Sequence, residues 1–116
     1  MRERGELWVA HLGAKRGRTP GKTRPVLLMQ AQALIDVDHP STLVIPLTTK
    51  LAEDAEPLRI RVPAQDKLRE DSDLLIDQLR AVDNRLLVRG PLAKLTPDLM
   101  DRVGRAVCEV LELDLE

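Results

Sequence analysis

The 116-residue chain can bury roughly two-thirds of the surface that its unfolded form exposes, so we expect one domain over residues 1–116. Its 43% hydrophobic residues are too many for a disordered chain. Its 32% charged residues, and the lack of any apolar run near the roughly 18 residues of a membrane helix, exclude a membrane protein. Residues 1–4 lead into no signal-peptide core, and a single cysteine, Cys108, allows neither an intrachain disulfide nor a cysteine cluster for zinc. We therefore expect a cytoplasmic protein with no cofactor and no membrane partner.

Charge is distributed unevenly along the chain, although the net charge is only −1. Residues 1–24 hold seven basic and two acidic side chains, a balance of +5, whereas residues 96–116 hold two basic and six acidic ones, a balance of −4. Such asymmetry suggests a polyanionic partner for the basic end. A charged run is more often a solvated face, so charge alone leaves nucleic-acid binding as the minority interpretation.

The first half of the chain is predicted to form three strands. Residues 6–12 read as a strand, residues 13–23 as a basic, glycine-rich loop, and residues 26–30 as an apolar strand buried on both faces. Pro25 restricts Arg24 to extended geometry, which places Arg24 at the start of that second strand. Residues 31–41 form a connector with room for one helical turn, and residues 42–49 form a third strand with Pro46 expected at a bulge or an edge.

The second half continues as β structure and ends in a helix. Residues 58–62 alternate apolar side chains with arginines, residues 74–78 form a strand with a polar end, and residues 79–82 and 86–88 form two short strands before a break at Gly90. Thr96 is an N-cap followed by a proline, and apolar residues recur at helical spacing after it. Gly104 within this helix suggests close backbone contact. The fold class is mainly β with a C-terminal α-helix, in which an antiparallel sheet curls into a partly closed barrel.

Four blocks of sequence carry a family resemblance. They are residues 4–8 (RGELW), 21–27 (GKTRPVL), 45–48 (IPLT) and 77–83 (DQLRAVD). In this order and spacing they resemble the MazF/PemK family of toxin endoribonucleases. The resemblance implies an SH3-like barrel, a homodimer, metal-independent cleavage of single-stranded RNA within a short recognition sequence, and a cognate antitoxin protein that covers the active surface.

The resemblance also implies roles for individual residues. Arg24 and Thr48 correspond to the catalytic pair, while Asp77 and Gln78, with Arg80 of the same block, correspond to the RNA path. Some relatives carry a basic residue two positions before that aspartate and a histidine in the first long loop. This sequence has Leu75 and Arg18 at those positions, so a histidine or a second strand arginine is not expected to transfer the proton.

Cleavage of RNA without a metal has chemical requirements that these residues can meet. The 2′-hydroxyl attacks the adjacent phosphorus, which gives a 2′,3′-cyclic phosphate and a 5′-hydroxyl through a phosphorane of increased negative charge. The guanidinium of Arg24 can bind two phosphate oxygens, and Thr48 can donate one more hydrogen bond. Arginine is not deprotonated in proteins, so the general base stays open between groups such as Asp77 and His11.

The basic loop offers a track for RNA phosphates. We favour phosphate binding by Lys15, Arg16, Arg18 and Lys22 over a merely solvated loop. Two alternatives remain: a non-catalytic nucleic-acid-binding barrel, such as an inactive toxin homologue, and a protein-interaction module of SH3 type. The second ranks last, because a polyproline groove is lined with aromatic side chains and this chain has one tryptophan, no tyrosine and no phenylalanine.

Overall fold

The computed structural model describes residues 1–13 and 22–114. This part of the chain forms seven strands, two α-helices and two short 3₁₀ helices, and none of its helices is long and apolar enough to cross a membrane. In chain order the elements are β1 (Glu6–His11), β2 (Thr23–Leu28), α1 (Gln32–Asp36), β3 (Ser41–Thr48), β4 (Arg59–Val62), β5 (Ser72–Leu75), η1 (Ile76–Gln78), β6 (Arg80–Asp83), η2 (Asn84–Leu86), β7 (Leu87–Lys94) and α2 (Pro97–Leu111).

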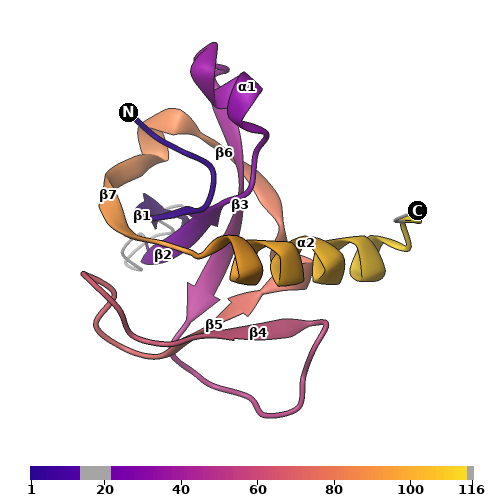
Figure 1. Cartoon of the computed structure of the whole chain (residues 1–116). Helices are drawn as coiled ribbons and strands as arrows, with labels where there is room; N and C mark the ends of the chain where they lie inside the picture. Colours follow the sequence, from indigo (N-terminus) through magenta and orange to yellow (C-terminus); the bar gives the residue numbers. More distant parts are fainter. Residues whose placement is uncertain (14–21, 115–116) are drawn as a thin grey trace.

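The strands form one curled antiparallel sheet (Figure 1). Its order is β4-β5-β3-β2-β1-β7, and β6 pairs with the first half of β3 while β5 pairs with the end of β3. The strands at the two ends of this order, β4 and β7, do not pair with each other among the described residues, so the barrel is only partly closed. This arrangement confirms the predicted fold class.

Buried side chains gather in two clusters on the two faces of the sheet. Alternate residues of β2 serve both clusters, with Leu27 in the larger and Val26 and Leu28 in the smaller, and all three are fully buried. Side chains alternate between the faces of a strand, so the continuous apolar run of β2 is buried on both sides, as the sequence predicted. Strand β2 and its neighbour β3 thus contribute side chains to the packing on both faces of the sheet.

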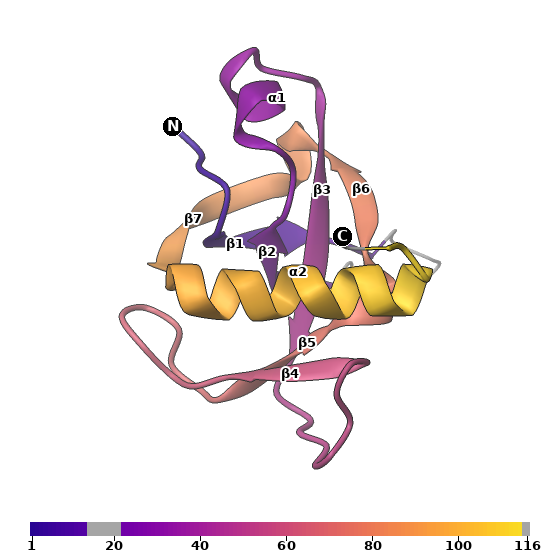
Figure 2. The same ribbon diagram turned by 45° about the vertical axis from the view of Figure 1, so that its right-hand side comes forward.

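Helix α2 covers the larger cluster and lies across one face of the sheet (Figure 2). It begins as predicted, with the Thr96 hydroxyl accepting a hydrogen bond from the backbone N–H of Leu99 at 3.2 Å and with proline in its first turn. Val103 and Ala106 point into the cluster and are buried. Gly104 makes no close contact, because a Cβ added there would meet nothing within 4 Å. The prediction of close backbone packing at this glycine is therefore wrong.

Most strand bounds differ from the prediction by a few residues: β2, for example, starts at Thr23 and ends at Leu28, and the largest differences are in β7 and β5. Strand β7 continues through Gly90 and Pro91 to Lys94, where a break was expected. Its register with β1 shifts between Leu7 and Val9, which pair with Ala93 and Arg89, so Pro91 lies at an irregularity of the ladder, where a strand tolerates a proline. Strand β5 starts at Ser72 and ends at Leu75, and Ile76, Asp77 and Gln78 after it form η1, because the chain turns there from the end of β3, beside β5, to the first half of β3, beside β6.

Pro46 lies at neither a bulge nor an edge strand. Its neighbour on β2 is Val26, in an unbroken register. On the other side of β3, pairing with β6 stops at Val44 and pairing with β5 starts at Leu47. Pro46 therefore occupies the gap where β3 changes partners, and its missing N–H removes no ladder hydrogen bond there.

The alternation in the fourth strand holds over a shorter range than expected. Within β4, Ile60 and Val62 are buried and the two arginines are half-buried. Leu58 precedes the strand and is 50% exposed, so it does not share the buried face.

Candidate active site

Arg24 and Thr48 lie on two neighbouring strands, beyond the point where the ladder between those strands ends. The register of β2 against β3 pairs Leu28 with Val44, Leu27 with Ile45 and Val26 with Pro46, and Arg24 and Thr48 each lie two residues past the last of these pairs. Side chains two residues apart along a strand share a face, so Arg24 lies on the same face of β2 as Val26, and Thr48 on the same face of β3 as Pro46. The ends of β2 and β3 thus carry two residues that are 24 positions apart in the sequence to one side of the sheet.

Both residues line a cavity of about 1000 Å³. Its walls come from β2, the end of β3, the loop between β4 and β5, and the middle of β7. The loop is held against β7 by a hydrogen bond from the backbone N–H of Lys67 to the carbonyl of Leu92, at 2.8 Å. The cavity is therefore bounded by hydrogen-bonded backbone on several sides.

Cationic side chains dominate this cavity. Among its described lining residues six are basic and two are acidic, which gives a balance of +4 in a chain whose net charge is −1. A concave, positively charged surface raises the local concentration of polyanions. The six basic residues are Lys22, Arg24, Lys50, Lys67, Arg69 and Arg89.

Four of these six cations were not singled out in the sequence. Lys50, Lys67, Arg69 and Arg89 come from the β3–β4 loop, the β4–β5 loop and β7, and no contiguous motif contains them. For one of these four cations, Arg89, the register of the strands indicates that it lies near Arg24. Arg89 pairs with Val9 in the ladder of β1 with β7, and Val9 pairs with Pro25 next to Arg24.

The other predicted RNA-binding residues lie elsewhere. Asp77 and Gln78 are exposed on η1, and Arg80 is exposed on β6, opposite Val44; none of the three lines the cavity. Lys22 does line it. Lys15, Arg16 and Arg18 fall outside the described residues, so their role stays a prediction, as does that of the η1 and β6 residues.

The two groups considered for proton abstraction are also outside the cavity. His11 is exposed at the end of β1, and Asp77 lies on η1. The carboxylates among the described lining residues are Asp66 and Glu70, both on the loop between β4 and β5. Within residues 1–13 and 22–114 no group of three or more histidine, cysteine or acidic side chains is placed to hold a metal ion.

Comparison with known proteins assigns a family. A family model described as the PemK-like, MazF-like toxin of type II toxin-antitoxin systems matches residues 3–111. The chain is 27% identical over 109 residues to Endoribonuclease EndoA of Bacillus subtilis (strain 168), a match that covers 90% of each protein.

Solved structures share the fold. The MazE-MazF complex (Form-II) from Deinococcus radiodurans matches with a TM-score of 0.80 at 22% identity, covering 97% of both chains. The Mycobacterium tuberculosis toxin MazF-mt6 matches with a TM-score of 0.77 at 21% identity, covering 95% of this chain and 99% of that one. With the family model spanning nearly all of its length, the chain belongs to the PemK-like, MazF-like toxins of type II toxin-antitoxin systems.

Proposed function

We propose that this protein is a toxin endoribonuclease that cleaves single-stranded RNA within a short recognition sequence, without a metal ion. The observation that carries the proposal is that Arg24 and Thr48, from the ends of neighbouring strands, line one cavity whose described side chains have a charge balance of +4. Family membership and the likeness to Endoribonuclease EndoA support the same activity. Cleavage proceeds by attack of the 2′-hydroxyl on the adjacent phosphorus and leaves a 2′,3′-cyclic phosphate and a 5′-hydroxyl.

We assign Arg24 and Thr48 to stabilisation of the phosphorane that forms during the attack. The Arg24 guanidinium binds two of its oxygens and offsets the charge that develops during attack. The Thr48 hydroxyl donates a further hydrogen bond to the same group, and one such donor contributes about 3 kcal/mol to transition-state stabilisation. Because both side chains start from hydrogen-bonded strands, little reorganisation is needed when the substrate binds.

The remaining cations of the cavity bind the phosphates on either side of the cleaved bond. Lys22 precedes β2 and Lys50 follows β3, next to the catalytic pair, while Lys67 and Arg69 of the β4–β5 loop and Arg89 of β7 line other parts of the cavity. The carboxylates within reach of an RNA in this cavity are those of Asp66 and Glu70. They replace His11 and Asp77 as the groups to test for abstraction of the 2′-hydroxyl proton.

The proposal also covers two protein partners, a cognate antitoxin and a second copy of this chain. Structures of related proteins include MazE-MazF complexes from Deinococcus radiodurans and an endoribonuclease in complex with its cognate antitoxin from Mycobacterial species. We propose that this chain likewise binds a cognate antitoxin and acts as a homodimer in the cytoplasm.

The competing function is a non-catalytic nucleic-acid-binding barrel. It also accounts for a cationic cavity, but it assigns no chemistry to Arg24. The test measures cleavage and filter retention of one single-stranded RNA by the wild-type protein and by Arg24→Ala. Loss of cleavage by about 10³-fold, with a smaller loss of retention and an unchanged melting temperature, supports the enzyme. Retention without cleavage by the wild-type protein supports the binding barrel.

A further inference from the structure

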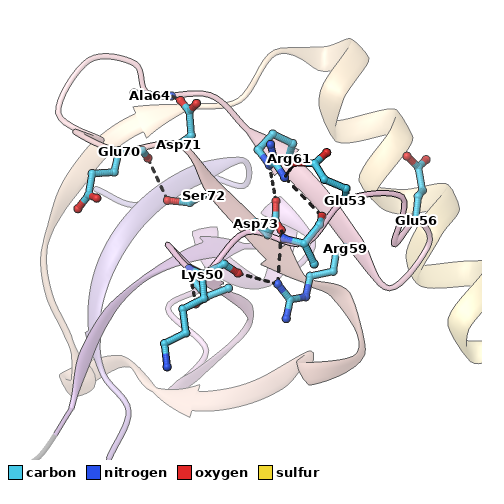
Figure 3. A network of polar contacts seen from close by, with 12 residues as sticks. Lys50, Glu53, Glu56, Arg59, Arg61, Ala64, Glu70, Asp71, Ser72 and Asp73 are labelled. Atoms are coloured by element: carbon cyan, nitrogen blue, oxygen red, sulfur yellow. Dashed lines mark hydrogen bonds and ion pairs between the residues drawn. The ribbon is translucent and has the colours of Figure 1, made fainter.

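A buried carboxylate lies beside the proposed site and is not part of the cavity wall. Asp73 of β5 is paired in the sheet with Thr48 on one side and with Arg61 on the other. Its side chain is 1% exposed. A carboxylate this deeply buried must be hydrogen-bonded, and it lies between the guanidinium groups of Arg59 and Arg61 (Figure 3).

Two arginines keep Asp73 ionised. The Asp73 Oδ1 accepts a hydrogen bond from Arg61 Nε at 2.6 Å, and Oδ2 accepts one from Arg59 Nη1 at 3.4 Å. Burial alone would raise the pKa of Asp73, but these bonds and one from the backbone N–H of Ala52 outweigh burial and hold the pKa below its ordinary value. The same contact with Asp73 raises the pKa of Arg61.

The same three side chains hold the loop that leaves β3. Asp73 Oδ2 accepts a hydrogen bond from the backbone N–H of Ala52 at 2.8 Å, and Arg61 Nη2 donates to the Ala52 carbonyl at 3.4 Å. Arg59 Nη1 donates to the carbonyl of Lys50 at 2.9 Å (Figure 3). Two of the three residues Lys50–Ala52 are thus fixed through their backbone groups by one buried cluster.

This loop in turn determines the direction of the Thr48 hydroxyl. The backbone N–H of Lys50 donates a hydrogen bond to Thr48 Oγ1 at 3.2 Å. A hydroxyl has one proton and two lone pairs, so a donor on the oxygen directs the remaining O–H away from that donor. Thr48 lines the cavity, and its O–H is then free to donate to an anion bound there.

We propose that Asp73, through Arg59 and the Lys50–Ala52 backbone, is a positioning residue that aims the Thr48 hydroxyl at the reacting phosphate. The inference rests on the proposed function, because it gives Thr48 a role only in cleavage. It differs from a purely structural role for a buried ion pair in one respect. A structural role lowers stability and activity whatever residue stands at position 48, whereas a positioning role acts only when the hydroxyl is present.

The test is a double-mutant cycle on RNA cleavage. Rates are measured for the wild type, Asp73→Asn, Thr48→Ala and the double variant, over a range of RNA concentrations that separates kcat from KM. We expect Asp73→Asn to lower kcat about ten-fold or more in the wild-type background, since small misplacement of a reacting group is costly. In the Thr48→Ala background the same change has no further effect on kcat.

A second variant keeps the proposal testable if Asp73→Asn does not fold. Arg59→Met removes the hydrogen bond to the Lys50 carbonyl but leaves Asp73 paired with Arg61. It is expected to lower kcat, with no effect in the Thr48→Ala background. Arg59→Lys retains a donor for the carbonyl and restores part of the rate.

The matched control is Glu56→Gln. Glu56 is also a carboxylate of the β3–β4 loop paired with an arginine, Arg102, but its partner lies on α2. The control is expected to leave kcat unchanged.

An equal fold-loss for Asp73→Asn with and without the Thr48 hydroxyl, or an unchanged kcat, overturns the inference while the proposed function stands. Absence of RNA cleavage by the wild type overturns both, and full activity of Thr48→Ala overturns the inference and the catalytic role of Thr48 together.

Discussion

Replacing Gly90 with alanine would place a methyl group in steric clash with the indole ring of Trp8. A Cβ built on Gly90 lies 2.4 Å from Trp8 Cδ2 and 2.6 Å from Cγ, about 1 Å closer than ordinary van der Waals contact. The indole cannot swing aside freely, because its Nε1 donates a hydrogen bond to Glu6 Oε1 at 3.0 Å and Glu6 is itself buried. The strand or the ring has to move.

The expected destabilisation follows from these two contacts. Overpacking costs about 1–3 kcal/mol, and loss of the indole hydrogen bond adds about 1 kcal/mol. Gly90→Ala is therefore expected to lower the free energy of unfolding by about 2–4 kcal/mol. At about 4 °C per kcal/mol for a domain of this size, the melting temperature falls by about 8–16 °C.

Gly104→Ala provides the matched comparison. The same methyl group there meets nothing within 4 Å, and the position lies within α2. Alanine is favoured over glycine inside a helix by about 0.5–1 kcal/mol, so the melting temperature is expected to rise by about 2–4 °C. Thermal unfolding of both variants, followed by circular dichroism, measures the difference. Gly90→Ala melting within about 2 °C of the wild type, or a destabilised Gly104→Ala, would refute this description of the packing.

Three further predictions concern the site and its support. Thr48→Ala is expected to lower kcat about 100-fold with an unchanged melting temperature, and an unchanged kcat would remove Thr48 from the chemistry. If about three cavity cations neutralise RNA phosphates, affinity measured by filter binding falls about 20-fold between about 50 and 200 mM salt, whereas a salt-independent affinity would count against the cavity as the RNA site. The pKa of Asp73 is held below its ordinary value, so Asp73 adds stability that is fully present above the unfolded-state pKa and is lost as the pH falls through the lower, folded-state value. The stability advantage of the wild type over Asp73→Asn should therefore be constant at neutral pH and shrink below about pH 4 in urea titrations, and an advantage that grows on acidification would contradict this assignment.

Local signals in the sequence were sufficient for the elements that define the fold. The apolar run of β2, the alternation within Arg59–Val62 of β4 and the Thr96 cap of α2 each depend on neighbouring residues, and each is present in the structure. Pro46 and the Gly90–Pro91 pair were misjudged for a different reason. Whether a proline is tolerated depends on whether its missing N–H would face a regular ladder partner, and that is set by how the strands pair in the folded sheet.

The residues of the site also differ in whether the local sequence reveals them. Arg24 and Thr48 could be named because each belongs to a short recognisable block, and the pairing of β2 with β3 then brings both residues to the wall of one cavity. The cations of the β4–β5 loop and β7 carry no local signal, since they become neighbours of Arg24 only when the sheet curls. The same is true of Asp73, whose link to Thr48 passes through two arginines and the backbone of a loop.

The most direct test of the central claim maps the ends produced from a long single-stranded RNA by the purified protein in EDTA. The account predicts discrete cuts, each leaving a 5′-hydroxyl and a 2′,3′-cyclic phosphate. A single 2′-deoxy substitution on the 5′ side of a mapped cut should abolish cleavage there, because the attacking hydroxyl is gone. Cleavage that persists at the deoxy position, or that occurs only after Mg²⁺ is restored, would contradict the account.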